Sequence, residues 1–222
     1  MKIAVIGAGG VGGYFGAKLA QAGYDVTLVA RGEHHNAIKS NGLVVKSILG
    51  NFTVKNINVT NSISNLNAPD LVILGVKAWQ VAEVAKELSA VVTPSTTVLP
   101  LQNGVMATEE LSQHINPSNV IGGLCRIISK IDAPGVINHF GIKPAIVFGE
   151  TNGSITPRIA RIKEVFDKAD IDSKASTDIT ADLWMKFISI CVSGLLAVSK
   201  TNYGVLTTTP ETRELMIELL TE

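Results

Sequence analysis

MKIAVIGAGGVGGYFGAKLAQAGYDVTLVAR, residues 1–31, contains a strand, a glycine-rich turn, a helix and a second strand in unbroken order. Lys2 to Ile6 is short and rich in β-branched apolar residues, which is typical of a parallel strand buried on both faces. Gly7, Gly9 and Gly12 come next at the spacing G-x-G-x-x-G. In this motif the first glycine permits a tight turn, the second lets the backbone approach a pyrophosphate, and the third allows close helix–strand packing. The free N–H groups and the dipole of the following helix favour an anion at that turn.

The glycine spacing alone could be a plain turn between two elements, so its context decides the interpretation. The motif comes after a strand, opens a helix with an apolar stripe (Val11, Phe15, Leu19), and Gly23 precedes a second strand, Asp25–Ala30. A dinucleotide-binding unit requires this arrangement. The stretch therefore predicts a dinucleotide site at the start of the chain.

The residue at the end of the second strand indicates which dinucleotide binds. An NAD site usually carries Asp or Glu about 20 residues after the glycines, where it bonds the ribose hydroxyls. Arg31 holds that place here, and a guanidinium suits a 2′-phosphate. The sequence predicts NADP(H), and the alternative is that Arg31 is a solvated surface charge.

The composition indicates a soluble globular chain of one domain or slightly more. Its 222 residues include 19 basic and 19 acidic side chains and no basic cluster, which argues against a nucleic-acid partner. The first strand begins at Met1 with no n-region or cleavage site before it, so we expect that it is not a signal peptide, and its apolar run is too short to span a bilayer. We therefore expect a cytoplasmic protein without a membrane partner. Cys125 and Cys191 each lie in an apolar stretch and are expected to be buried free thiols.

Alternating strand and helix patterns along the chain predict an α/β fold with a doubly wound sheet. The adjacent His34 and His35 lie in one predicted helix and point in different directions, so we expect solvated surface and assign no metal site. The predicted strands are 43–45, 52–59, 70–76, 96–101, 119–131, 136–140 and 145–149, and the predicted helices are 32–41, 78–90, 156–169, 178–199 and 210–222.

Two of these strands end in polar residues that a packed core does not require. Lys77-Ala78-Trp79-Gln80 comes directly after one strand, and Gln102-Asn103-Gly104 comes after the next. Lys77 could extend to solvent and Asn103-Gly104 could be a plain turn. Ligands of doubly wound sheets bind beyond the carboxyl ends of the strands. We therefore predict that both segments contact the nicotinamide half of the cofactor and the substrate.

Asp178 to Ser199 predicts a long and strongly apolar helix that Lys186 interrupts. A lysine at such a position is either a surface residue or one that faces a cleft, where it could give a proton to a substrate carbonyl. So apolar a helix needs a partner that covers it, because each Å2 of apolar surface removed from water contributes about 25 cal/mol of stabilisation. We expect a homodimer to form through residues 178–199.

GAGGVG, Arg31, KAWQ at 77–80, QNG followed by EEL at 102–111, and LWMKF at 183–187 together resemble the ketopantoate reductases, or 2-dehydropantoate 2-reductases. The resemblance covers essentially the whole chain. It implies a Rossmann domain at 1–176 followed by the start of an all-helical domain at 177–222. It also implies NADPH as hydride donor and reduction of the 2-oxo acid 2-dehydropantoate to pantoate, in the route to pantothenate and coenzyme A.

The resemblance also implies a role for each matched residue. Arg31 would bind the 2′-phosphate, Lys77 would lie near the nicotinamide ribose, Asn103 would contact cofactor and substrate, and Lys186 would be the general acid. The residues implied to bind the cofactor are Gly7, Ala8, Gly9, Gly10, Val11, Gly12, Arg31, Lys77, Gln80 and Asn103, and those implied to bind substrate are Asn103 and Lys186.

The chain departs from the family pattern at the substrate side and in length. Ile190 and Gly194 stand where asparagines are expected four and eight residues after the lysine, and Tyr203 replaces an amide. Lost hydrogen-bond partners weaken discrimination for a hydroxylated substrate. Family members continue for several more helices, so we expect the helical domain to be incomplete. Two alternatives stay open: a reductase of another 2-oxo acid or ketone, and a non-catalytic NADP-binding sensor module.

Overall fold

The computed structural model describes residues 1–221 and confirms the predicted start of the chain. Strand β1 (Lys2–Ile6), helix α1 (Gly10–Gln21) and strand β2 (Asp25–Val29) follow one another, and α2 (Gly32–Asn41) comes next. Alternate residues of β1 enter two different cores: Ile3 packs with α1, whereas Ile6 packs with helices on the opposite face. This strand is therefore covered on both sides, which explains its continuous apolar sequence.

The first sheet is parallel and has five strands in the order β5-β2-β1-β6-β7. The added strands are β5 (Asn58–Thr60), β6 (Leu71–Leu74) and β7 (Thr97–Pro100), and the helices on the face opposite α1 are α3 (Val81–Leu88) and α4 (Ala107–Ser112). Ile6 pairs with Val29 on one side and with Leu74 on the other. The carboxyl ends of these strands are thus level, and the segments that leave the strands there lie along one edge of the sheet.

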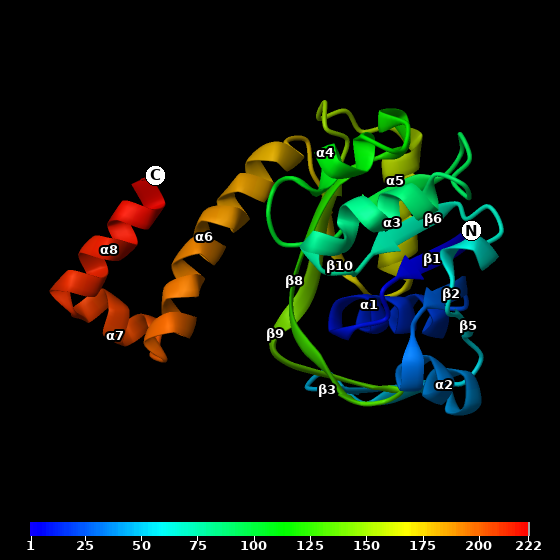
Figure 1. Ribbon diagram of the computed structural model, residues 1–222, viewed down its shortest axis with the longest axis horizontal. Coiled ribbons are helices and arrows are strands. Elements are labelled where there is room, and N and C mark those ends of the chain that lie inside the picture. The colour runs from blue at the N-terminus through cyan, green and yellow to red at the C-terminus, as the bar shows by residue number, and fades with distance from the viewer. Residues whose placement is uncertain (222) are drawn as a thin grey trace.

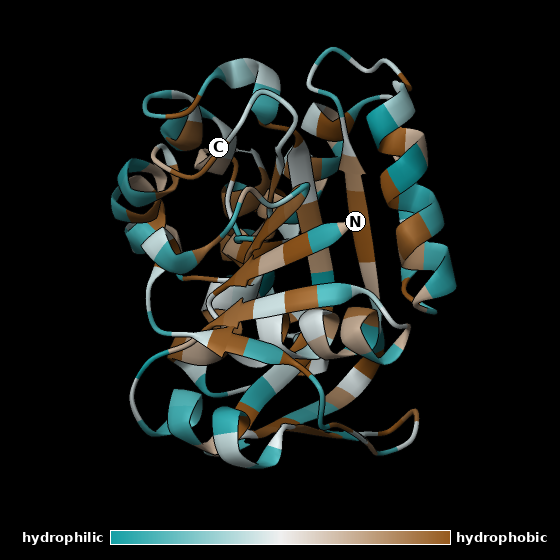
Figure 2. Ribbon diagram, turned by 90° about the vertical axis from the view of Figure 1, so that its right-hand side faces the viewer, coloured by the Kyte–Doolittle hydropathy of each residue, from teal (hydrophilic) through white to brown (hydrophobic). Residues whose placement is uncertain are grey.

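A second, mixed sheet packs on the other side of α1, where a single sheet was expected. Its order is β10-β9-β3-β4, and β8 pairs with β9. The strands are β3 (Leu43–Ser47), β4 (Phe52–Val54), β8 (Gly122–Ala133), β9 (Val136–Gly149) and β10 (Asp172–Ala175). Val98 of β7 bridges Val120 just before β8, so the two sheets are joined. The resulting body has apolar strands at its centre and polar helical surfaces outside (Figure 2).

Some predicted boundaries were wrong because pairing partners decided them. The segment predicted as one strand at 52–59 divides into β4, which pairs with β3, and β5, which pairs with β2 in the other sheet. The segments predicted as separate strands at 136–140 and 145–149 form the single strand β9. Residues 141–144 bulge opposite Ile127, and Gly141 adopts a φ of 82° there. The predicted helix at 78–90 begins with a 3₁₀ turn, Ala78–Gln80, before α3.

The last helices extend away from this body (Figure 1). They come after α5 (Pro157–Lys168) and β10, and they are α6 (Ile179–Ser199), α7 (Tyr203–Thr208) and α8 (Pro210–Thr221). In α6 only Ile179 and Val192 are buried, and in α7 only Leu206. Large apolar side chains are exposed along this helical arm, namely Trp184, Met185, Val198, Tyr203, Val205, Leu215, Ile217 and Leu220. The domain division at 176/177 and the dimer through 178–199 stay predictions.

Within residues 1–221, α6 is long and apolar enough, by length and composition alone, to cross a membrane. Its most apolar stretch of 18 residues has a mean hydropathy of 1.6, and 6% of that stretch is buried. Its first turn nevertheless packs on the second sheet, where a side chain at Gly122 would collide with Ile179. We therefore describe α6 as a helix docked on the protein by its N-terminal half.

Candidate functional site

The glycine turn between β1 and α1 is shaped by backbone contacts that tolerate no side chain at two of its glycines. Gly7 has a φ of 91°, and its N–H and that of Ala8 donate to the Val29 carbonyl at 3.1 and 3.2 Å. A Cβ on Gly12 would collide with the Gly7 carbonyl, so α1 lies directly against the turn. A Cβ on Gly9 would meet nothing within 4 Å. The turn is therefore open on the Gly9 side, where the first N–H groups of α1 lack helical partners.

Two cavities meet at this open side and form a continuous groove. One has a volume of about 300 Å3 and the other about 410 Å3, and they share Gly9, Gly75, Val76 and Lys77. Arg31 lines the smaller cavity, at the end of β2. Asn103 lines the larger one, after β7. The groove thus runs across the carboxyl ends of the first sheet, as expected for an α/β fold.

Nearly all residues predicted to bind the cofactor line this groove. Gln80 also stabilises the 3₁₀ turn at 78–80, because its Oε1 accepts the N–H of Lys77, which precedes that turn, at 3.1 Å. Gly10 also permits close packing, since a Cβ there would meet the Ser129 carbonyl of β8 at 2.6 Å. Gly12 lines neither cavity. The predicted residues in the groove are Gly7, Ala8, Gly9, Gly10, Val11, Arg31, Lys77, Gln80 and Asn103.

Lys186 of α6 lines neither cavity itself, but its side chain bonds two residues of the larger one. Its Nζ donates to Asn103 Oδ1 at 2.9 Å and to the Cys125 carbonyl at 2.6 Å, and both acceptor residues line the cavity. An ammonium has three N–H donors, so one is left for a ligand beyond these two contacts. Burial lowers the pKa of Lys186, a Cys125 thiolate would oppose this, and the charge of Arg126 lowers it further. Burial raises the pKa of Cys125 to about 11, so that residue remains a thiol at neutral pH.

Gln102, to which no separate role was assigned from the sequence, has its side chain built into the groove. Its Nε2 donates to the carbonyls of Leu74 and Val76 at 3.0 and 3.1 Å and so clamps the end of β6 around Gly75. Its Oε1 is buried without a partner among the described residues, and Gln102 lines the larger cavity. A buried acceptor without a donor is costly, so this atom suits a ligand N–H or a bound water.

His34 contradicts the prediction that both adjacent histidines are solvated surface. Its Nε2 lies 2.8 Å from the Ala8 carbonyl, and its Nδ1 accepts the Gly135 N–H at 3.0 Å. Burial lowers the pKa of His34. The contact with Gly135 joins residues 101 positions apart, so local sequence carries no signal for it. Within residues 1–221, the ring of His35 bonds only its neighbour Asn36, with Nδ1 3.1 Å from Asn36 Oδ1.

The three departures from the expected substrate residues lie on the helical arm. Ile190 and Gly194 come after Lys186 at four-residue steps on α6, so they share its face. A Cβ on Gly194 would meet nothing within 4 Å. Tyr203 Oη bonds Ser193 Oγ at 2.6 Å. The side chains at 190 and 194 therefore offer no hydrogen bond next to the lysine.

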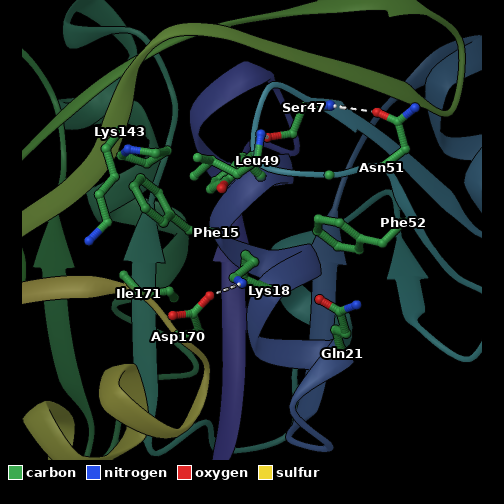
Figure 3. A pocket seen from close by; sticks show the side chains of 13 residues that line it. Phe15, Lys18, Gln21, Ser47, Leu49, Asn51, Phe52, Lys143, Asp170 and Ile171 are labelled. Carbon is green, nitrogen blue, oxygen red and sulfur yellow. Dashed lines mark hydrogen bonds and ion pairs between the residues drawn. The ribbon is translucent and has the colours of Figure 1, made fainter.

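A further cavity of about 260 Å3 lies along the C-terminal half of α1 (Figure 3). Phe15, Lys18 and Gln21 of α1 face the turn between β3 and β4, and Lys18 Nζ pairs with Asp170 Oδ2 at 3.0 Å. None of the predicted site residues lines it. It is therefore distinct from the groove at the glycine turn.

Comparison with known proteins finds one family. A family model described as Ketopantoate reductase PanE/ApbA matches residues 3–153. An uncharacterized oxidoreductase of Bacillus subtilis (strain 168), YkpB, is 34% identical over 86% of this chain and 62% of its own length. A 2-dehydropantoate 2-reductase of Nostoc sp. (strain PCC 7120) is 32% identical over 100% of this chain and 70% of its own length.

Solved structures agree with the sequence relatives. The 2-dehydropantoate 2-reductase from Porphyromonas gingivalis W83 is 28% identical with a TM-score of 0.92, and the match covers 100% of this chain and 79% of that one. The one from Geobacter metallireducens GS-15 is 30% identical with a TM-score of 0.90, covering 100% and 74%. This chain spans less than two thirds of YkpB.

Proposed function

Because the chain belongs to the ketopantoate reductase family, we propose that it is an NADP(H)-dependent reductase of a 2-oxo acid, with 2-dehydropantoate as the first candidate substrate. The observation that carries this proposal is the position of Lys186, whose Nζ lies 2.9 Å from Asn103 Oδ1 on the wall of the groove. A proton donor and a dinucleotide-sized groove thus meet at one point. The same proposal places the protein in pantoate formation in the cytoplasm.

The residues of the groove fit a bound NADP(H). The open side of Gly9 leaves room for a pyrophosphate against the N-terminus of α1. Arg31 at the end of β2 suits the 2′-phosphate. Lys77 borders both cavities and suits the ribose near the nicotinamide, and Asn103 and the free oxygen of Gln102 border the other end. When bound, NADPH would supply the hydride.

Lys186 is the residue we assign to proton transfer. Reduction of a carbonyl builds negative charge on its oxygen, and an ammonium within hydrogen-bond reach stabilises that charge and can donate a proton to it. The Asn103 side chain and the Cys125 carbonyl hold two of the three N–H groups of Lys186, which directs the third. Its lowered pKa makes the lysine a better acid near neutral pH.

A reductase of a different 2-oxo acid or ketone is the second candidate. Ile190 and Gly194, on the face of α6 that carries Lys186, supply no hydrogen bond for a substrate hydroxyl. A site without such partners discriminates weakly in favour of a hydroxylated substrate. An apolar substrate side chain would suit Ile190 and Gly194 better than a hydroxyl does.

Steady-state NADPH oxidation tests the proposal. The protein is offered 2-dehydropantoate and a panel of 2-oxo acids with apolar side chains, and the dissociation constant for NADPH is measured separately. Turnover with the highest kcat/KM on 2-dehydropantoate is expected from the first candidate, and a preference for apolar 2-oxo acids from the second. Tight NADPH binding without turnover of any carbonyl would instead favour the sensor module. Absence of NADPH binding would contradict all three.

A further inference from the structure

We propose that His34 is a positioning residue of the dinucleotide site: its neutral ring ties the glycine turn to the β8–β9 hairpin, and protonation of the ring weakens dinucleotide binding. This inference rests on the proposed function, because it concerns the same cofactor. The tie itself is a property of the protein without any ligand. It can therefore be tested separately.

The two hydrogen bonds of His34 are compatible with a single form of the ring. The Gly135 N–H can only donate, so Nδ1, 3.0 Å away, must carry a lone pair. The Ala8 carbonyl can only accept, so Nε2, 2.8 Å away, must carry the hydrogen. Both bonds exist together only in the neutral ring with its proton on Nε2.

On the side of the glycine turn, the ring fixes the Ala8 peptide group. The Gly7 and Ala8 N–H groups already donate to the Val29 carbonyl at the end of β2. His34 binds the carbonyl of Ala8, so the turn is held from both sides. The N–H groups that come after Ala8 are thereby directed toward the open side of Gly9.

On the hairpin side, the ring holds the turn between β8 and β9. Gly135 is buried with a φ of 75°, and its carbonyl accepts the Val44 N–H of β3 at 2.9 Å. A Cβ on Gly135 would lie 3.1 Å from the Ala37 side chain of α2. Ile131, on the same hairpin, lines the smaller cavity together with His34. The ring therefore sets the distance between the glycine turn and one wall of the groove.

Protonation removes this tie. A hydrogen on Nδ1 would face the Gly135 N–H, so the bond is lost and two donors oppose each other. Burial lowers the pKa of His34 below its ordinary 6.5, and the bond to the Ala8 carbonyl partly opposes this. The tied form thus binds fewer protons, and dinucleotide affinity is expected to fall as the pH falls through the pKa of His34.

Histidine is the side-chain type whose ordinary pKa lies between about pH 5 and 8. The glycine turn contributes no ionisable side chain. His35 is the second histidine and serves as the control. The charged residues that share the smaller cavity with His34 are Arg31, at the N-cap of α2, and Lys77 and Glu83 across the cavity. Glu33 precedes His34 on α2, and on the β8–β9 hairpin Asp132 pairs with Lys46 at 2.9 Å.

The affinity test measures the dissociation constant of NADPH at about pH 8 and about pH 5.5 for wild type, His34→Gln and His35→Gln. We expect wild type and His35→Gln to lose about tenfold more affinity on acidification than His34→Gln loses. His34→Gln should already bind less tightly at the higher pH. The 2′-phosphate of NADPH titrates near pH 6, but it does so equally for all three proteins. The same pH dependence in wild type and His34→Gln would overturn the inference.

A second measurement on the protein without cofactor separates the tie from the proposed function. In ¹⁵N NMR spectra of wild type, the Gly135 amide and the His34 ring nitrogens should titrate together, with a neutral Nε2–H form at neutral pH. A Gly135 amide that ignores the titration of His34 would show that no tie exists. An intact tie in a protein that binds no NADPH at either pH would contradict the proposed function, and with it the claim about affinity.

Discussion

The glycine turn and the helical arm are held in place by different means. At the turn, Gly7, Ala8 and Gly12 are fixed by backbone hydrogen bonds and by close contacts within a buried core. On the arm, α6 to α8 leave several large apolar side chains exposed, and Val198 is 84% exposed. Lys186 is the arm residue that reaches the groove through hydrogen bonds to Asn103 and the Cys125 carbonyl.

This contrast separates two kinds of preorganisation. The half of the groove proposed to bind the dinucleotide is fixed by the sheet, so substitution of a single side chain there should change cofactor affinity more than it changes the geometry of the groove. The half proposed to donate a proton depends on one side chain, Lys186, with two hydrogen bonds, so loss of this side chain should change the rate more than the cofactor affinity. The effects of substitutions in the two halves should therefore differ in kind as well as in size.

The largest effect is expected from Lys186→Ala. On a carbonyl substrate that wild type reduces, turnover should fall about 100-fold or more, within the range of general acid catalysis, while NADPH affinity changes little. Stopped-flow NADPH oxidation at saturating cofactor measures this, with Lys200→Ala, an exposed lysine of the same arm, as the matched control. A mutant rate within a few-fold of wild type would exclude Lys186 as the proton donor.

Arg31→Ala tests the cofactor side. Loss of a charge-assisted hydrogen bond to the 2′-phosphate should weaken NADPH binding by about 1.5–3 kcal/mol, or roughly 10- to 100-fold, and leave NADH binding unchanged. Calorimetric titration with both cofactors gives the comparison. Equal affinities of wild type for NADPH and NADH would show that Arg31 does not bind the 2′-phosphate.

Gly9→Ala and Gly12→Ala form a matched pair within the glycine turn. At Gly12 the added methyl collides with the Gly7 carbonyl, and such overpacking should lower the free energy of unfolding by about 1–3 kcal/mol. At Gly9 the methyl enters open space, so stability should change by less than about 1 kcal/mol. NADPH affinity of Gly9→Ala should nevertheless fall about tenfold or more. Thermal unfolding and NADPH titration together check the pair, and an unaffected affinity in Gly9→Ala would place the pyrophosphate elsewhere.

The smallest effect concerns the alkaline limb of the pH–rate profile. Donation requires a charged Lys186, so turnover should decline as pH rises through its lowered pKa, below the ordinary 10.5. The stability of the folded protein should instead increase over the same pH range. In that pH window the unfolded chain binds more protons at this residue than the folded chain, so the free energy of unfolding rises with pH. Lys186→Arg keeps its charge, and its profile should lack this limb.

Much of the fold could be predicted from the sequence because its signals are local. The apolar run of β1, the glycine spacing and Gly23 lie within one stretch, and the structure confirms β1 and α1 there. The ends of β4, β5 and β9 could not be predicted because distant pairing partners set them. β10 carries no strand signal because its sequence, DSKA, is polar and half exposed.

The candidate site likewise contains residues that could be predicted from the sequence and residues that could not. Lys77 and Asn103 are predictable from their positions after buried strands, and both line the groove. Gln102 is not, because a glutamine at a strand end looks like an ordinary polar residue until its contacts with the end of β6 are seen. The prediction for His34 was wrong because its partner, Gly135, is 101 residues away.

That long separation also bears on the order in which the chain folds. The β1–α1–β2 unit is made of contacts between near neighbours, which form quickly, whereas the His34–Gly135 and Lys186–Asn103 contacts close loops of 101 and 83 residues. The groove is therefore complete only after the β8–β9 hairpin and α6 have docked. A ligand that binds only the completed groove would stabilise the last step of assembly by mass action. Refolding in the presence of NADPH should accordingly raise the yield of native protein more than it raises the rate at which the first sheet forms.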